Sequence, residues 1–136
     1  MMRRDLVRSV LALVLLSACG DNTPTGASTV TGTYTLRTVN GAALPYTMSQ
    51  TATSKVELLD DAISLYQGGT YSTVSHVRTT TNGTPVTETR EGAGTYILLG
   101  TSITLVTSDR SSQRLATGDA TSMTFVESGV TQIYRK

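Results

Sequence analysis

The chain has 136 residues, with 11 basic and 10 acidic side chains and a formal net charge of +1. This balance, without a basic run, gives no electrostatic support for nucleic-acid binding and excludes it as the leading function. A single cysteine excludes an intramolecular disulfide, so the fold must depend on packing and strand pairing.

The first 18 residues have the pattern of a secretory signal. Arginines precede an apolar run over residues 10–16, and the small residues Ser17 and Ala18 follow it. The run is far shorter than the roughly 20 residues that a helix needs to cross a bilayer. We therefore predict a signal peptide over residues 1–18.

The end of this run, Leu16-Ser17-Ala18-Cys19, resembles the signal end of bacterial lipoproteins. The resemblance implies cleavage before Cys19, a diacylglyceryl thioether on its sulfur and acylation of the new amino terminus. Several acyl chains hold a protein firmly to a membrane, whereas one chain binds marginally. The alternative is an ordinary signal peptide followed by an unpaired thiol.

The residue after the cysteine bears on location. In bacterial lipoproteins an aspartate there favours the inner membrane, and this chain has Gly20 instead. The resemblance therefore implies lipid anchoring to the outer membrane, facing the periplasm. Residues 19–29 are small, polar and rich in chain breakers, so we expect a flexible tether before a domain over residues 30–136.

The tethered part reads as a succession of short strands rich in threonine, a residue that suits pleated sheets. We expect strands over residues 30–39, 55–59, 62–66, 70–80, 86–90, 95–99, 102–107, 113–117, 121–126 and 130–135. Asp60-Asp61 either separates two strands or bends one long strand. Residues 44–46 predict a loop carrying apolar groups to a barrel mouth, since Pro45 disfavours a central strand. Gly92-Ala93-Gly94 predicts a break.

Eight to ten short strands with regular turn signals, and no amphipathic helical period after the signal, predict an all-β fold. We expect an antiparallel barrel of eight to ten strands, with a sandwich as the alternative. Closure into a barrel is favoured because it removes exposed strand edges.

The start of the first strand, Gly32-Thr33-Tyr34, resembles the opening of lipocalin-like domains in bacterial lipoproteins, and domains of the heat-shock lipoprotein (META) type open similarly. Lipocalins have Gly-x-Trp at this place and an arginine near the end of the last strand that packs across the Trp. The resemblance implies that Tyr34 takes the Trp place and Arg135 the arginine place, as a cation–π pair.

Lipocalin-type barrels can hold one small ligand, although others fill their interior with side chains. The candidate inward-facing set is Tyr34, Leu36, Tyr96, Leu98, Ile103, Leu105, Met123 and Phe125. These residues predict either the lining of a ligand cavity or a plain core.

Residues with catalytic or metal-binding chemistry are sparse. His76 lies in a polar strand and predicts a surface histidine, with a ligand or catalytic base as the alternative. Asp60-Asp61 could offer oxygens to calcium, but adjacent carboxylates in a bend usually face solvent. We expect no catalytic residue, metal or cofactor.

The sequence thus predicts a non-enzymatic module that binds a small apolar or amphipathic ligand in a barrel mouth. The alternative is a structural or envelope-stress lipoprotein that contacts a protein partner through its surface, with a filled interior and either an exposed surface patch or an open strand edge. An enzyme would require His76 to face an acid and a hydroxyl across a cleft.

Overall fold

The structure is a computed structural model, and it describes residues 30–136. The predicted signal peptide, the predicted lipidation at Cys19 and the predicted tether over residues 19–29 lie outside this part of the chain. No helix in the described part is long and apolar enough to span a membrane.

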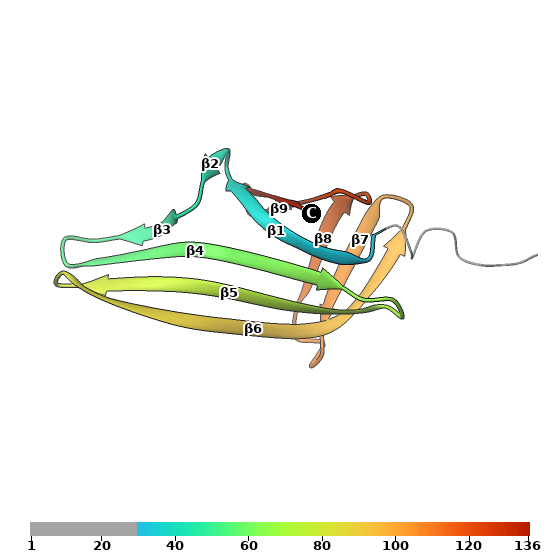
Figure 1. Ribbon diagram of the computed structural model, residues 1–136, viewed down its shortest axis with the longest axis horizontal. Coiled ribbons are helices and arrows are strands. Elements are labelled where there is room, and N and C mark those ends of the chain that lie inside the picture. The colour runs from blue at the N-terminus through green and yellow to red at the C-terminus, as the bar shows by residue number, and fades with distance from the viewer. Residues whose placement is uncertain (1–29) are drawn as a thin grey trace, which may run out of the picture.

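The described residues form one antiparallel sheet of ten strands (Figure 1). The strands are β1 (Gly32–Val39), β2 (Ala42–Ala43), β3 (Tyr46–Gln50), β4 (Ser54–Leu65), β5 (Thr70–Thr81), β6 (Thr84–Leu99), β7 (Ser102–Thr107), β8 (Gln113–Gly118), β9 (Ser122–Glu127) and β10 (Val130–Arg135).

Eight of these strands close into a barrel. Strands β4 to β10 pair in succession, β10 pairs with β1, and β1 returns to β4, with Gly32 opposite Leu65 and Thr35 opposite Ala62. The two extra strands, β2 and β3, add to β1 and β4. The prediction of an all-β antiparallel barrel is confirmed, and the sandwich alternative is wrong.

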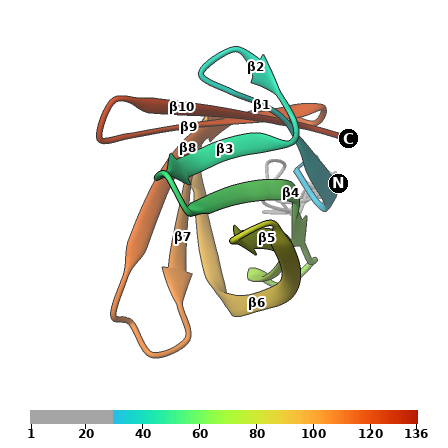
Figure 2. The same ribbon diagram turned by 90° about the vertical axis from the view of Figure 1, so that its left-hand side faces the viewer.

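Strands β4, β5 and β6 are longer than the barrel needs. Their outer halves extend beyond it together with β3, and we call this extension the arm: β3, residues 54–59, residues 76–81 and residues 84–91. Figure 1 shows the arm on the left, and Figure 2 looks at it from that side.

The predicted break at Gly92-Ala93-Gly94 is wrong, because β6 runs without interruption for 16 residues. The glycines allow close approach of neighbouring groups instead. A Cβ at Gly94 would collide with the carbonyl oxygen of Val106, and one at Gly92 would lie 2.7 Å from Oγ1 of Thr73. Asp60-Asp61 likewise separates no strands, since β4 is continuous with a register shift between Leu58 and Asp60.

The barrel end farther from the arm is closed by tyrosine hydroxyls. Tyr34 donates to the carbonyl oxygens of Val30 and Asp119, at 2.7 and 2.9 Å. Tyr96 donates to the carbonyl oxygen of Tyr66 at 2.9 Å. Burial, followed by the nearby Asp119 carboxylate, raises the pKa of Tyr34 to about 12. Burial also raises the pKa of Tyr96, so both hydroxyls stay protonated.

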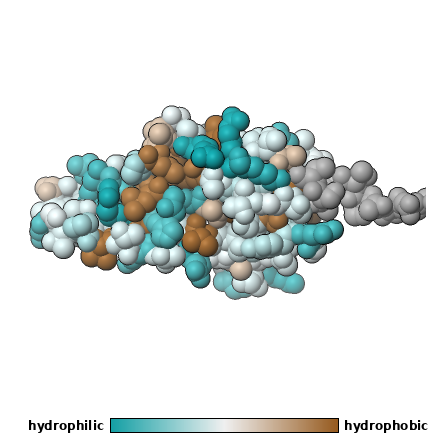
Figure 3. Space-filling view, viewed as in Figure 1, coloured by the Kyte–Doolittle hydropathy of each residue, from teal (hydrophilic) through white to brown (hydrophobic). Residues whose placement is uncertain are grey.

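Residues 44–45 connect β2 to β3, so the predicted loop is one residue shorter than expected and Tyr46 begins β3. Leu44 and Tyr46 pack against the core as expected. In Figure 3 hydrophobic surface gathers where this connection crosses from the barrel to the arm. The remaining surface in that view is mostly pale or hydrophilic.

Candidate binding site at the barrel mouth

The eight predicted inward-facing residues belong to one hydrophobic core. Tyr34, Ile103, Met123 and Phe125 are fully buried, and Leu98 is the partly buried member of the set. The buried side chains of Ile63, Leu65 and Tyr134 fill the same interior. The predicted set therefore packs together, as a core does.

The predicted cation–π pair exists with a different residue. Arg135 is exposed, whereas Nζ of Lys136 lies 5.0 Å from the centroid of the Tyr34 ring. The prediction for Arg135 is wrong by one position, because Tyr134 points into the barrel and the alternation of the strand turns its neighbour outward.

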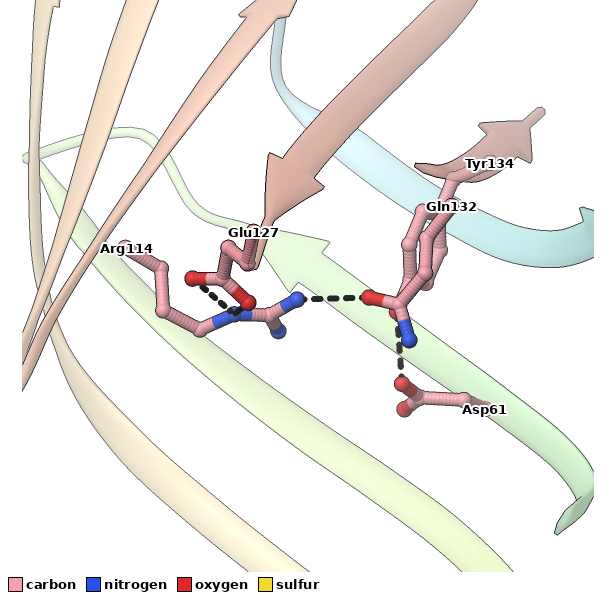
Figure 4. A network of polar contacts seen from close by, with 5 residues as sticks. All are labelled: Asp61, Arg114, Glu127, Gln132 and Tyr134. Atoms are coloured by element: carbon pink, nitrogen blue, oxygen red, sulfur yellow. Dashed lines mark hydrogen bonds and ion pairs between the residues drawn. The ribbon is translucent and has the colours of Figure 1, made fainter. Parts of the chain in front are cut away.

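A network of polar side chains lies at the barrel end nearer the arm (Figure 4). It joins residues that are distant in sequence and come from four strands. Its members are Asp61 (β4), Arg114 (β8), Glu127 (β9), Gln132 (β10) and Tyr134 (β10).

Arg114 is the positive centre of this network. Its Nε donates to both carboxylate oxygens of Glu127, at 3.1 and 3.2 Å, and its Nη2 donates to Oε1 of Gln132 at 2.7 Å. The guanidinium also lies 4.1 Å from the centroid of the Phe125 ring, a cation–π distance. These contacts fix the guanidinium.

The second part of the network pairs a phenol with a carboxylate. The hydroxyl of Tyr134 donates to Oδ2 of Asp61 at 2.6 Å. Burial raises the pKa of Asp61, although the hydrogen bond from Tyr134 acts in the opposite direction. Burial, together with the Asp61 carboxylate, also raises the pKa of Tyr134. The phenol therefore stays a donor.

A pocket of about 300 Å³ opens beside Arg114, where β6 separates from β7. Its apolar wall comes from Tyr71, Leu105 and Ala93, and its polar wall from Arg114 and the loop between β7 and β8. The further lining residues are Thr73, Gly92, Thr107, Ser108, Asp109 and Ser111. Of the eight predicted interior residues, Leu105 lines this pocket.

The loop between β7 and β8 is held by Asp109. Its Oδ1 accepts hydrogen bonds from the Thr107 hydroxyl at 2.7 Å and from the backbone N–H and hydroxyl of Ser111 at 2.9 and 2.7 Å. These bonds lower the pKa of Asp109 to about 2, and the bond from the Thr107 hydroxyl contributes most. One wall of the pocket is thus a preformed turn carrying a negative charge.

Hollows also lie outside the mouth. One of about 350 Å³ is at the arm tip around residues 50–55, and one of about 500 Å³ lies against residues 72–74 and 91–93. Both are more open than the mouth pocket, and neither is lined by a core residue.

His76 and Asp60 lie on the outer face of the sheet, whereas Asp61 faces the barrel interior. Nδ1 of His76 lies 2.6 Å from Oδ1 of Asp60 across β4 and β5, on the outside of the sheet. Asp61 points inward to Tyr134, so the two carboxylates do not share a site. Within residues 30–136 no cluster of three or more metal-ligating side chains occurs.

Asp61, Arg114 and Tyr134 were not predicted to form a site from the sequence. One signal was available, because Arg114 shares its strand face with Ala116, which is buried. An arginine on the core face of a strand needs buried partners, and this need points to a polar network inside the barrel. Comparison of the chain with known protein families, with curated proteins and with solved structures found no match.

Proposed function

We propose that this protein is a lipid-anchored envelope protein whose barrel binds a small amphipathic molecule at its mouth, without catalysing a reaction. The observation that carries the proposal is the pocket beside Arg114, where a fixed guanidinium faces an apolar wall. Ligand sites combine a concave apolar surface with a few fixed polar groups in this way.

The size and lining of the pocket restrict the kind of molecule that can bind there. A volume of about 300 Å³ is at the lower end of ligand pockets, so the molecule is small. Arg114 is already paired with Glu127, and Asp109 lies on the facing turn, so the site does not favour a strongly anionic ligand. A neutral molecule with hydrogen-bonding groups on one side and an apolar side fits both walls.

We propose that Cys19 carries the lipid, that residues 19–29 form the tether, and that the anchor holds the domain to the periplasmic side of a bacterial outer membrane. We also propose that the barrel is lipocalin-like. Tyr34 at the start of β1, covered by a cation from the chain end, supports this relationship.

The experiment is native mass spectrometry of the lipoprotein purified in detergent from a bacterial envelope. We expect a reproducible bound small molecule in the wild type, and its loss in Arg114→Gln. Arg78→Gln is the matched control, because Arg78 also pairs with a glutamate, Glu57 at 2.8 Å, but lies on the arm outside the pocket. Retention of the molecule in both variants, or an unliganded wild type, would contradict the proposal.

The alternative function is that of a structural or envelope-stress lipoprotein that contacts a protein partner. The filled barrel interior favours it, as does the outer edge of β6, which pairs with no strand of the described residues. An unliganded mass in the experiment above, together with co-purification of one envelope protein, would support this function over ligand binding.

A further inference from the structure

One edge of the arm has no neighbouring strand among the described residues. β6 pairs with β5 from Thr84 to Thr95, but with β7 only from Gly94 to Leu99. Within the described residues no strand lies on the other side of residues 84–93, and all of them are exposed. Figures 1 and 2 show this stretch as the lower edge of the arm. Such an edge is a template for another strand.

The direction of its backbone groups follows from the β5–β6 hairpin. A two-residue turn closes this hairpin, so Thr84 bonds to Thr81, and the backbone groups then alternate between the two sides of β6. The residues that point away from β5 are Pro85, Thr87, Thr89 and Glu91. Ala93 continues the series, because its carbonyl oxygen accepts a hydrogen bond at 3.1 Å from the backbone N–H of Ser108.

The side chains along this edge carry both signs of charge. Glu88 and Arg90 are two residues apart, so they share one face of the strand, and their side chains are 62% and 57% exposed. They contact each other at 3.5 Å. A pair of this kind leaves both groups available for a second, opposite charge.

We propose that two copies of this chain pair through their β6 edges, antiparallel, with Thr89 of one copy opposite Thr89 of the other. The outward backbone groups of Thr89 then bond across the two-fold axis, and Thr87 of each copy bonds to Glu91 of the second copy. Glu88 of each copy lies opposite Arg90 of the second copy, twice by symmetry. The edge is thus complementary to itself in hydrogen bonds and in charge.

Other two-fold registers are less favourable. Centring the axis on Glu88 or on Arg90 places like charges directly opposite each other, which destabilises an antiparallel pair. Centring it on Glu91 places that carboxylate directly opposite the same carboxylate of the second copy. Centring it on Thr87 places Glu88 against Val86 and forms no ion pair.

Charged residues and proline at a strand edge can also protect it from pairing with another strand. Pro85 lies at the outer end of the free stretch, so Thr87, Thr89 and Glu91 keep their N–H donors. The arm's other edge, β3, has five residues and a register shift between Thr47 and Ser49, which is the usual form of protection. β6 is longer and regular, and it has no such bulge.

The first test is disulfide cross-linking of the full chain in isolated membranes under a mild oxidant. Directly opposed residues in a hydrogen-bonded pair have Cα atoms about 5.5 Å apart, within the range of a disulfide. We expect Thr89→Cys to give a covalent dimer. Thr87→Cys is the matched control, because the two copies of this residue would lie about 14 Å apart along the strands. The wild type controls for Cys19.

The second test is charge reversal on the Thr89→Cys background. Glu88→Arg, and separately Arg90→Glu, would place like charges opposite each other, and we expect each to weaken association about tenfold. The double variant Glu88→Arg/Arg90→Glu exchanges the charges and should restore cross-linking. The side chains substituted in the two tests are all exposed in the single chain, so the substitutions should not prevent folding. They are those of Thr87, Glu88, Thr89 and Arg90.

The outcomes separate this proposal from its alternatives. Efficient cross-linking at 89, little at 87 and restoration by the double variant would support it. Equal cross-linking at both positions, no cross-linking, a heteromeric product, or indifference to charge reversal would overturn it. The pocket at the barrel mouth plays no part in these measurements, so the result is independent of the proposed ligand.

Discussion

Tyr134→Phe tests the polar network inside the barrel. The substitution keeps the buried ring and removes one hydroxyl, whose partner is the Asp61 carboxylate at 2.6 Å. A hydrogen bond to a charged group contributes roughly 1.5–3 kcal/mol, so we expect a loss of about 2 kcal/mol in the free energy of unfolding. For a domain of this size the melting temperature would fall by about 8 °C.

Tyr96→Phe is the matched control at the other end of the barrel. Its hydroxyl donates to a neutral acceptor, the carbonyl oxygen of Tyr66 at 2.9 Å. We expect a loss of about 1 kcal/mol, roughly 4 °C in melting temperature, with little dependence on pH. Both variants would be measured by thermal and urea unfolding followed by circular dichroism.

The pH dependence distinguishes the two variants. Burial raises the pKa of Asp61 in the folded protein, and the Tyr134 hydrogen bond partly offsets this, so removing the bond raises that pKa further. A raised folded pKa gives stability that is present at low pH and lost as pH rises through it. The penalty of Tyr134→Phe should therefore be small in acid and grow towards neutral pH. Equal, pH-independent penalties for the two variants would contradict the hydrogen bond from Tyr134 to an ionised Asp61.

Three further substitutions probe packing and turns, each followed by equilibrium unfolding. Gly94→Ala should destabilise the barrel by about 3 kcal/mol, because its Cβ meets the carbonyl oxygen of Val106; a neutral result would contradict the close approach of β6 and β7. Phe125→Ala should cost about 4 kcal/mol, since this fully buried ring fills the core under the guanidinium; a cost below 1 kcal/mol would indicate a hollow interior. Hydrogen bonds lower the pKa of Asp119 to about 2, and the bond from the backbone N–H of Thr121 contributes most. The Asp119 carboxylate therefore stabilises the folded protein fully above about pH 4, and this stabilisation is lost as pH falls through about 2. Asp119→Ala should therefore be less stable than the wild type at neutral pH and converge with it in strong acid.

Much of the barrel could be predicted from the sequence because the strands alternate and their turns carry strong signals. Tyr34, Leu36, Ile103, Leu105, Met123 and Phe125 were predicted to face inward, and all are buried. Glycine was the residue type that misled the prediction. At Gly92 and Gly94 it permits close strand contact within a continuous β6, and sequence alone cannot distinguish this from a break.

The mouth site could not be predicted because its parts meet only when the barrel closes. Asp61 and Tyr134 are 73 positions apart, and each looks ordinary within its own strand. The inward direction of Arg114 depends on the register of β8 against β7 and β9, which residue types alone do not fix. Lys136 in place of Arg135 shows the same sensitivity to a shift of one residue.

Amide NMR of the isotope-labelled protein most directly tests the proposed binding at the mouth beside Arg114 and the packed barrel interior. Spectra would be compared before and after removal of any small molecule that co-purifies. We predict that shifts concentrate in the turn between β7 and β8 and at Ala93, which line the pocket. Shifts concentrated at Tyr34 and Met123, in the packed interior, or no shift at the mouth, would contradict the proposed binding site.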